Sequence, residues 1–347
     1  MDWKSWVKCA NRWLSDREYR ARRTVLRSRP WSLQWDITSR CNLSCIYCSR
    51  KLHLGAGMDM PAALVDRVRR ELLPYASNLV LGGMGEPLLH PEIKRVFRRL
   101  ERSPFSFINL ITNGTLLDDE MISIILGIPI NQVVLSLDSV RPDVLPRIRR
   151  GLDFPRLMAL LENLTTRRAA ISIGPKLVIN MVLNRLNVDQ VKEMAAFAIE
   201  RGFHQLCIST IYGLIDDGAH RDGDPLYLTA GDRDRLRDDL PAAAAMMAAQ
   251  NLGFSFNSDR DDVGMPMDYT AGNLFVGFPP PRLRDPGVDW SIRTAFPTQQ
   301  PTASCSAPWR HMLLHANGDV SLCCFSIGKP LATITDKPVR EAWNSRQ

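Results

Sequence analysis

Six apolar runs rich in β-branched residues alternate with amphipathic helical patterns through the middle of this chain. The runs cover residues 33–38, 78–82, 105–112, 132–138, 176–183 and 203–210. The helical patterns between them cover residues 61–74, 91–102, 117–126, 154–168 and 188–201. Strands that alternate with helices form parallel sheets, because each helix carries the chain back across the sheet. The chain is therefore predicted to be an α/β protein with a partial, TIM-like (β/α)6 barrel.

The barrel pattern is predicted to occupy residues 31–215, between less regular segments. Residues 1–30 are predicted to form a helical extension that docks through one apolar stripe. The stripe consists of Trp3, Trp6, Val7, Trp13 and Leu14. Residues 216–304 hold a helical pattern at 230–250 and then many prolines, which indicates an irregular bridge along the substrate pocket. Residues 305–347 are predicted to form a small iron-sulfur-type extension, with a hairpin around Asn317 and Gly318 and a helix near 339–344.

Unusual residues follow four of the predicted strands at the point where each strand ends. Three cysteines follow the first run, and Gly-Gly-Met-Gly-Glu-Pro (82–87) follows the second. Thr-Asn-Gly (112–114) follows the third run, and Ser-Leu-Asp (136–138) closes the fourth. Ligand sites in parallel α/β folds lie at the carboxyl ends of the strands. All four segments are therefore expected to meet at one mouth of the barrel.

Cys41, Cys45 and Cys48 lie in the run Cys-Asn-Leu-Ser-Cys-Ile-Tyr-Cys. Three thiolates can hold three irons of a [4Fe-4S] cluster and leave the fourth iron open for chemistry. Two other interpretations stay open, since this spacing also puts small residues on one face of a helix and since cysteines bind zinc. Structural zinc sites usually take four ligands in two close pairs, and the sequence contains no second Cys-x-x-Cys pair.

The pattern Cys-x3-Cys-x-aromatic-Cys, with Tyr47 before the last cysteine, resembles the signature of radical S-adenosylmethionine (SAM) enzymes. The resemblance implies that the open iron chelates the amino and carboxylate groups of SAM. One electron from the cluster then splits the sulfonium and yields a 5'-deoxyadenosyl radical. The cluster ligands implied are Cys41, Cys45 and Cys48, and the SAM contacts implied are Tyr47, Gly83, Met84, Gly85, Glu86, Asn113, Ser136 and Asp138.

These SAM contacts have different implied roles. By resemblance, Tyr47 lies against the adenine, and Glu86 with the backbone carbonyls of the glycine-rich run receives the SAM ammonium. Asn113, Ser136 and Asp138 match positions that contact the ribose and the carboxylate. Taken without the resemblance, the same residue types are also common in strand-to-helix turns and helix caps.

The C-terminal segment carries a second resemblance. Cys305-x12-Gly318-x4-Cys323 is similar to the opening half of the SPASM/Twitch extension, which holds an auxiliary [4Fe-4S] cluster in many radical SAM enzymes. Cys305, Cys323 and Cys324 are the candidate ligands, and the sequence has no further cysteine pair after them. The auxiliary cluster is therefore either incomplete or absent. Cys207 lies in the sixth run and is interpreted as a core residue, with a weak second claim as a hydrogen donor.

Composition limits the class of protein and its partners. The apolar fraction is 45%, the charged fraction is 23%, and no apolar run is long enough to cross a bilayer. The net charge is +7, with basic residues concentrated at 20–29 and 141–150, yet no nucleic-acid recognition motif accompanies them. We expect a solvated basic face, although Arg149 or Arg150 could instead pair with the SAM carboxylate. No nucleic acid or membrane partner is expected, and scattered cysteines fit a reducing cytoplasm.

The favoured hypothesis is a radical SAM enzyme that oxidises or epimerises a small polar, carbohydrate-like metabolite. Epimerisation would need a hydrogen donor such as Cys207, and oxidation would need an auxiliary cluster as electron acceptor. The alternative within the family is a peptide-modifying enzyme. An alternative of another class is a non-catalytic iron-sulfur or zinc protein. A catalytic role also implies an electron donor such as flavodoxin or ferredoxin.

Overall fold

A ten-stranded sheet forms the centre of the chain, with the strand order β12-β11-β10-β1-β3-β4-β5-β7-β8-β9. The structure is a computed structural model that describes residues 3–48, 50, 57–101, 105–210, 226, 228–257, 306–322 and 330–345. The strands of this sheet are β1 (Ser32–Trp35), β3 (Asn78–Leu81), β4 (Phe107–Thr112), β5 (Gln132–Ser136), β7 (Lys176–Leu183), β8 (Gln205–Thr210), β9 (Gly253–Asn257), β10 (His311–Leu314), β11 (Asp319–Ser321) and β12 (Ala332–Thr333). All neighbours from β10 to β9 are parallel, and β11 and β12 are antiparallel additions.

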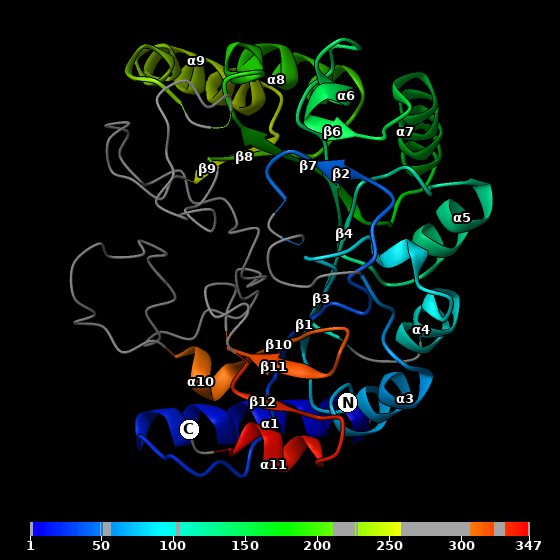
Figure 1. Cartoon of the computed structure of the whole chain (residues 1–347), viewed down its shortest axis with the longest axis vertical. Helices are drawn as coiled ribbons and strands as arrows, with labels where there is room; N and C mark the ends of the chain where they lie inside the picture. The colour runs from blue at the N-terminus through cyan, green and yellow to red at the C-terminus, as the bar shows by residue number, and fades with distance from the viewer. Residues whose placement is uncertain are drawn as a thin grey trace.

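Helices cover one face of this curved sheet, as Figure 1 shows for α3, α4, α5, α7, α8 and α9. The helices are α1 (Trp3–Arg20), α3 (Ala62–Glu71), α4 (Ile93–Leu100), α5 (Asp119–Gly127), α6 (Leu145–Ile148), α7 (Phe154–Ala169), α8 (Val191–Glu200), α9 (Ala230–Ala249), α10 (Ala307–Arg310) and α11 (Val339–Trp343), with 3-10 turns η1 (Pro87–Leu89) and η2 (Val188–Gln190). Local side-chain caps begin several of them. Asp118 accepts a bond from Met121 N at the start of α5, and Asp153 caps α7 in the same way. No described helix is both long and apolar enough to cross a membrane.

The six predicted strands and the parallel α/β class are confirmed. The sheet is larger than predicted, because β10 pairs with β1 in parallel and β9 pairs with β8 in parallel. The predicted C-terminal hairpin is also confirmed, since β10 and β11 are antiparallel around Gly318, which has a φ of 89°. Within the predicted irregular bridge, the helix expected at 230–250 is confirmed as α9, and β9 is an element that was not predicted. Residues 258–304 of that bridge lie outside the described residues.

The two faces of the sheet differ in polarity. On β1, Leu33 and Trp35 are fully buried in the main core under the helices. The alternate residues face the inner, concave side, where the parallel register aligns Gln34 of β1 with Val80 of β3. Other strands give this inner face Asn109, Asn180, Gln205, Ser209 and Ser255. The sheet therefore has an apolar outer face for packing and an inner face on which these polar residues alternate with apolar ones such as Val134 and Val178.

The expectation that α1 docks through its apolar stripe is wrong. Trp3, Trp6 and Trp13 are 71%, 65% and 60% exposed, whereas the buried residues of α1 are polar. The reason is that α1 packs against the amino ends of the strands, where backbone carbonyls need donors. Lys8 Nζ donates to Ala76 O over 2.5 Å. Asn11 and Ser15 also donate to backbone carbonyls, whereas the Glu18 carboxylate accepts from the backbone N–H groups of Arg27 and Ser28.

Candidate active site

The cysteine loop begins five residues after β1 ends, at the carboxyl edge of the sheet. Within it, β2 (Ser44–Cys45) pairs antiparallel with β6 (Arg149–Arg150), which follows α6. The register places Cys45 opposite Arg149. Figure 1 shows the two short strands together at one end of the molecule. The loop that carries the three cysteines is thus fixed to the segment that follows the fourth predicted strand.

Hydrogen-bond donors surround two of the three thiols. Leu43 N lies 3.4 Å from Cys41 Sγ, and Asn113 Nδ2 lies 3.8 Å from the same sulfur. Arg149 Nη1 lies 3.9 Å from Cys45 Sγ. Burial raises the pKa of Cys45 to about 11 and also raises the pKa of Cys41, while Arg149 and the Leu43 N–H oppose these shifts. These donors therefore lower the cost of holding sulfur in the thiolate form that iron needs.

Arg149 belongs to a buried network with Asp138 and Tyr47. Its Nε lies 2.8 Å from Asp138 Oδ2, and its Nη2 donates to the Tyr47 hydroxyl over 2.8 Å. The hydroxyl donates in turn to Asp138 Oδ2 over 2.6 Å. Burial alone would lower the pKa of Arg149, but the Asp138 carboxylate raises it, so this guanidinium stays charged. Asp138 and Tyr47, both predicted SAM contacts, thus bind a cation that also reaches Cys45.

The glycine-rich run after β3 lies directly against the end of β1. Gly83 has a φ of 153°, and a Cβ there would lie 2.8 Å from Asp36 Oδ1 and would also collide with Gln34. A Cβ on Gly85 would collide with Thr38 O and lie 2.7 Å from Arg40 O. Glycine is therefore required for this close backbone approach.

Glu86 ties this run to the end of β4. Its buried carboxylate accepts bonds from Thr112 Oγ1 and Asn113 N, both at 2.7 Å, and from Leu88 N at 3.2 Å. Burial raises the pKa of Glu86 to about 7, and these three donors oppose the shift. Contact of Glu86 with the SAM ammonium remains a prediction, because the carboxylate is already engaged by protein donors.

Asn113 and Ser136 occupy the ends of the next two strands. Asn113 Nδ2 donates to Asn42 Oδ1 over 2.9 Å, and its Oδ1 accepts from Thr115 Oγ1 over 2.7 Å. Ser136 ends β5 and is half-buried, two residues before Asp138. Asn113 therefore joins the cysteine loop to the turn after β4, as convergence at one mouth requires.

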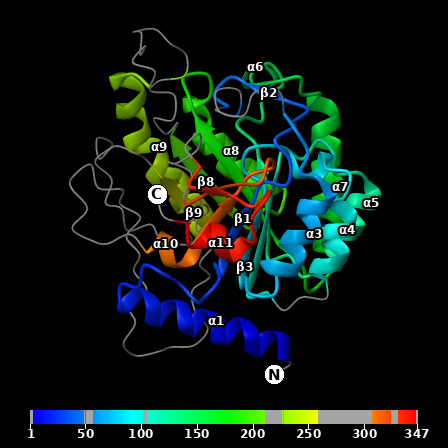
Figure 2. The ribbon, with the colours of Figure 1, turned by 60° about the horizontal axis from the view of Figure 1, so that its bottom comes forward.

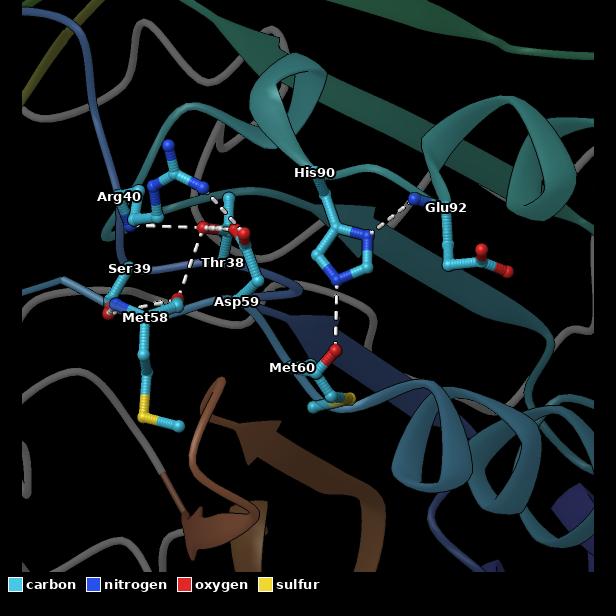
Figure 3. A network of polar contacts seen from close by, with 8 residues as sticks. All are labelled: Thr38, Ser39, Arg40, Met58, Asp59, Met60, His90 and Glu92. Carbon is cyan, nitrogen blue, oxygen red and sulfur yellow. Dashed lines mark hydrogen bonds and ion pairs between the residues drawn. The ribbon is translucent and has the colours of Figure 1, made fainter.

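A polar clamp, formed by Thr38, Ser39, Arg40, Met58 and Asp59, closes the two ends of the cysteine loop. Thr38 Oγ1 and Arg40 Nη1 both donate to the Asp59 carboxylate over 2.7 Å. Ser39 N donates to Met58 O over 2.9 Å, and the Met58 N–H returns a bond of 2.9 Å to Ser39 Oγ. Figure 3 shows this clamp beside His90, which contacts Met60 O. The clamp therefore joins the segments that precede and follow the cysteines.

Asp36 connects the C-terminal hairpin with the glycine-rich run. One oxygen of this buried carboxylate lies 3.4 Å from the Met84 N–H, and the other lies 3.4 Å from His315 Nδ1. His315 Nε2 is 3.1 Å from Ser321 Oγ on β11. The hairpin thus reaches the segment expected to hold SAM through one buried chain of polar contacts.

The remaining predicted ligands have different outcomes. Cys207 is 1% exposed and packs with Val134 and Val178 on the inner face, and burial raises its pKa to about 12. Cys305, Cys323 and Cys324 lie outside the described residues, so their ligand roles stay predictions. Over the described part of the chain, no three His, Cys, Asp or Glu side chains are placed to bind one metal ion. A [4Fe-4S] cluster differs from such a site, because each thiolate binds a separate iron.

The residues at the mouth fit a [4Fe-4S] cluster and SAM. Three cysteines from one clamped loop provide the sulfur donors, and Arg149 provides a buried cation next to Cys45. Gly83 and Gly85 let the glycine-rich run pack closely against the end of β1 and the start of the cysteine loop. The sequence alone is equally consistent with Arg149 contacting SAM and with Arg149 lying on the surface. It does not identify Asp36, Asp59 or His315 as residues of the site. Strand-end position was the available signal for Asp36.

Comparison with known proteins agrees with this site. The sequence model of the radical SAM superfamily matches residues 35–221, more than half of the chain, and that of an iron-sulfur cluster-binding (SPASM) domain matches residues 305–347. The chain is 27% identical over 190 residues to the tungsten-containing aldehyde ferredoxin oxidoreductase cofactor-modifying protein of Pyrococcus furiosus, covering 52% of each protein. It is 33% identical over 186 residues to the PqqA peptide cyclase of Gluconobacter oxydans, covering 51% of this chain and 48% of that protein. The chain thus spans about half the length of these relatives.

Solved structures show the same fold. Streptococcus suis SuiB bound to S-adenosylmethionine superposes with a TM-score of 0.61 at 16% identity, covering 94% of this chain and 68% of SuiB. Native anSMEcpe with bound AdoMet superposes with a TM-score of 0.59 at 17% identity, covering 90% of this chain and 80% of anSMEcpe. Family membership implies SAM and [4Fe-4S] clusters as cofactors. The chain belongs to the radical SAM superfamily and carries a C-terminal SPASM iron-sulfur cluster-binding domain.

Proposed function

We propose that this enzyme reductively cleaves SAM and removes a hydrogen atom from an unactivated carbon of a polar substrate. The observation that carries the proposal is the meeting of the cysteine loop, the glycine-rich run and Asp138 at one mouth of the sheet. When bound by Cys41, Cys45 and Cys48, the cluster supplies the electron for that cleavage.

The protein's own residues hold and orient the reacting groups. Arg149 keeps a positive charge beside Cys45, and Asp138 keeps Arg149 in place. Gly83 and Gly85 let the run after β3 pack against the end of β1, which positions this run beside the cysteine loop for contact with SAM. The clamp through Asp59 limits movement of the cysteine loop, which keeps reacting atoms aligned.

A small polar metabolite is the first candidate substrate, and oxidation or epimerisation is the candidate outcome. Polar residues on the inner face of the sheet support it, because Asn109, Asn180 and Ser209 would offer hydrogen bonds to hydroxyl or amine groups. Cys207 packs between valines, which makes it a poor hydrogen donor and favours oxidation. Flavodoxin or ferredoxin is the proposed electron donor.

A peptide is the second candidate substrate. The names of the relatives support both classes, since they include a probable GTP 3',8-cyclase of Methanothermobacter marburgensis and PqqA peptide cyclases. Transfer of deuterium from substrate to 5'-deoxyadenosine would distinguish a metabolite substrate from a peptide substrate. A substrate deuterated on carbon passes deuterium to 5'-deoxyadenosine when it reacts, so we expect mass-shifted 5'-deoxyadenosine with deuterated sugars and none with deuterated peptides. The reverse result would replace the metabolite with a peptide.

The first experiment is detection of 5'-deoxyadenosine by mass spectrometry after anaerobic cluster reconstitution, with SAM and dithionite. Cys45→Ala is expected to lose both iron and product. Cys9→Ala is the matched control, because Cys9 is exposed on α1 and should leave both unchanged. Product formation by Cys45→Ala would refute the assignment, and an iron-loaded wild-type protein without product would support a non-catalytic role.

A further inference from the structure

The outward face of α1 is apolar and aromatic, although helices on a domain surface normally turn such a face inward. Trp3, Trp6 and Trp13 are the three most prominent residues there, each at least 60% exposed. Trp6 and Trp13 line a shallow hollow together with Cys9, Ala10 and Leu14. Over ten residues of helix the tryptophans extend along about 15 Å of the surface. Exposed apolar patches of this kind mark binding surfaces.

The opposite face of α1 holds the helix in this orientation. Lys8 donates to Ala76 O, its ammonium lies 3.5 Å from the centre of the Phe105 ring, and Ser15 Oγ donates to Trp309 O over 2.7 Å. Rotating the tryptophans inward would break these buried bonds and bury their unpaired carbonyl partners, which is costly. The outward aromatic face is therefore a fixed feature of the fold.

Charge on this helix is asymmetric. Arg17 and Arg20 are exposed on the same side as the tryptophans, and the Arg17 guanidinium lies 4.7 Å from the centre of the Trp13 ring. The carboxylates of the helix are engaged by the domain, since Asp16 pairs with Arg310 over 2.9 Å and Glu18 binds the backbone at residues 27 and 28. The exposed side of α1 therefore offers tryptophan together with positive charge.

We propose that this face binds the surface of an anionic lipid bilayer, with α1 lying flat in the headgroup region. Tryptophan prefers this interface because its ring is apolar and its N–H is polar, and arginine and lysine bind anionic headgroups. A second copy of the chain fits less well, because facing two such helices would bring like charges together. The proposal departs from the sequence-based expectation of no membrane partner, which stays a prediction.

The position of α1 leaves the candidate active site accessible. The helix contacts Ala76, Phe105 and Arg29, which precede β3, β4 and β1 at the amino ends of the strands. The cysteine loop lies at the carboxyl ends, and Figure 2 shows α1 beside α10 and away from β2. Binding through α1 would hold the enzyme on a bilayer while its mouth faces the aqueous side.

The test is vesicle flotation of the cluster-loaded full chain. Vesicles of pure phosphatidylcholine are compared with vesicles of phosphatidylcholine and phosphatidylglycerol in equal amounts. We expect binding to the anionic vesicles only, weakening with added salt. Trp6→Ser/Trp13→Ser should reduce partitioning by on the order of tenfold per tryptophan. Arg17→Gln/Arg20→Gln should reduce it about fivefold per arginine.

Ile173→Ser is the matched control, since Ile173 is 90% exposed and lies far along the chain from α1. It should bind like wild type, and all variants should keep wild-type circular dichroism and iron content. No binding of wild type to anionic vesicles would overturn the proposal, as would unchanged binding by the tryptophan variant. A wild-type dimer that the tryptophan variant converts to monomer would also overturn it and assign the face to a second copy.

Discussion

Replacing Arg149 with Met tests whether the buried network holds the cysteine loop. The Arg149 side chain is 6% exposed and that of Asp138 is fully buried, and the two form an ion pair of 2.8 Å. Removing one partner of a buried pair costs about 3–5 kcal/mol, because the other charge stays buried. Asp138 would keep bonds from the Tyr47 hydroxyl and from Val182 N. We therefore expect Arg149→Met to lower the free energy of unfolding by about 3 kcal/mol, at the lower end of that range.

The assay is urea unfolding of the iron-free protein, followed by circular dichroism. Arg150→Met is the matched control, because Arg150 is the exposed neighbour on the same short strand, and it should change stability by less than about 0.5 kcal/mol. A double-mutant cycle with Asp138→Asn should give a coupling of about 2 kcal/mol. Cluster-loaded Arg149→Met should also retain less iron, because Cys45 loses its neighbouring cation.

Three results would refute this reasoning. A loss below about 1 kcal/mol for Arg149→Met would mean that Asp138 is not left as an uncompensated buried charge. Equal losses of unfolding free energy for Arg149→Met and Arg150→Met would mean that the burial of Arg149 does not make it more important for stability than Arg150. Additive effects in the double-mutant cycle would show that Arg149 and Asp138 act independently.

Three further predictions concern the loop, the C-terminal strand and the SAM-binding run. Asp59→Asn removes the negative charge and one of the two acceptor oxygens of the clamp, and it should cost about 1 kcal/mol of unfolding free energy and speed iron loss to a chelator. Glu92→Gln, outside the clamp, should do neither. Burial lowers the pKa of His311 from 6.5 to about 4, so its contribution to stability is complete above pH 6.5 and is lost as the pH falls through 4. Lowering the pH from 6.5 to 4 should therefore reduce the free energy of unfolding by up to about 3 kcal/mol. His311→Gln should make the free energy of unfolding less dependent on pH in this range. Gly85→Ala should weaken SAM binding at least tenfold in calorimetry, because backbone carbonyls occupy its Cβ position, while Gly127→Ala, with open space, should bind normally.

Hydrophobic periodicity predicted the strands and the helices that cover them, because each strand buries one face locally. It could not predict how α1 docks. The partners of its polar side chains are carbonyls such as Ala76 O and Trp309 O, which lie 68 and 294 residues away in the sequence. Pairing of β10 with β1 is equally remote, since it joins His311 to Ser32. Contacts of this separation leave no local pattern.

The mouth itself was predictable from the rule that parallel strands end at one edge. The interactions within it were less predictable. Tyr47 and Asp138 were each assigned to SAM alone, yet the structure joins them to one another and to Arg149. A motif gives the residue types at a strand end, whereas hydrogen-bond geometry depends on how loops from different strands pack.

Strand register explains why the cation beside Cys45 lies outside the cysteine motif. Cys45 and Arg149 are opposite each other only because β2 pairs with β6, and shifting this pairing by one residue would place Arg150 there instead. Arg149 is buried and Arg150 is exposed, so the register also decides which charge is desolvated. Asp138, two residues after the end of β5, offsets the cost of burying Arg149 by pairing with it. The cysteine loop, the segment after α6 and the end of β5 are therefore coupled through these contacts, and a cysteine motif without the paired basic segment would lack the cation beside Cys45.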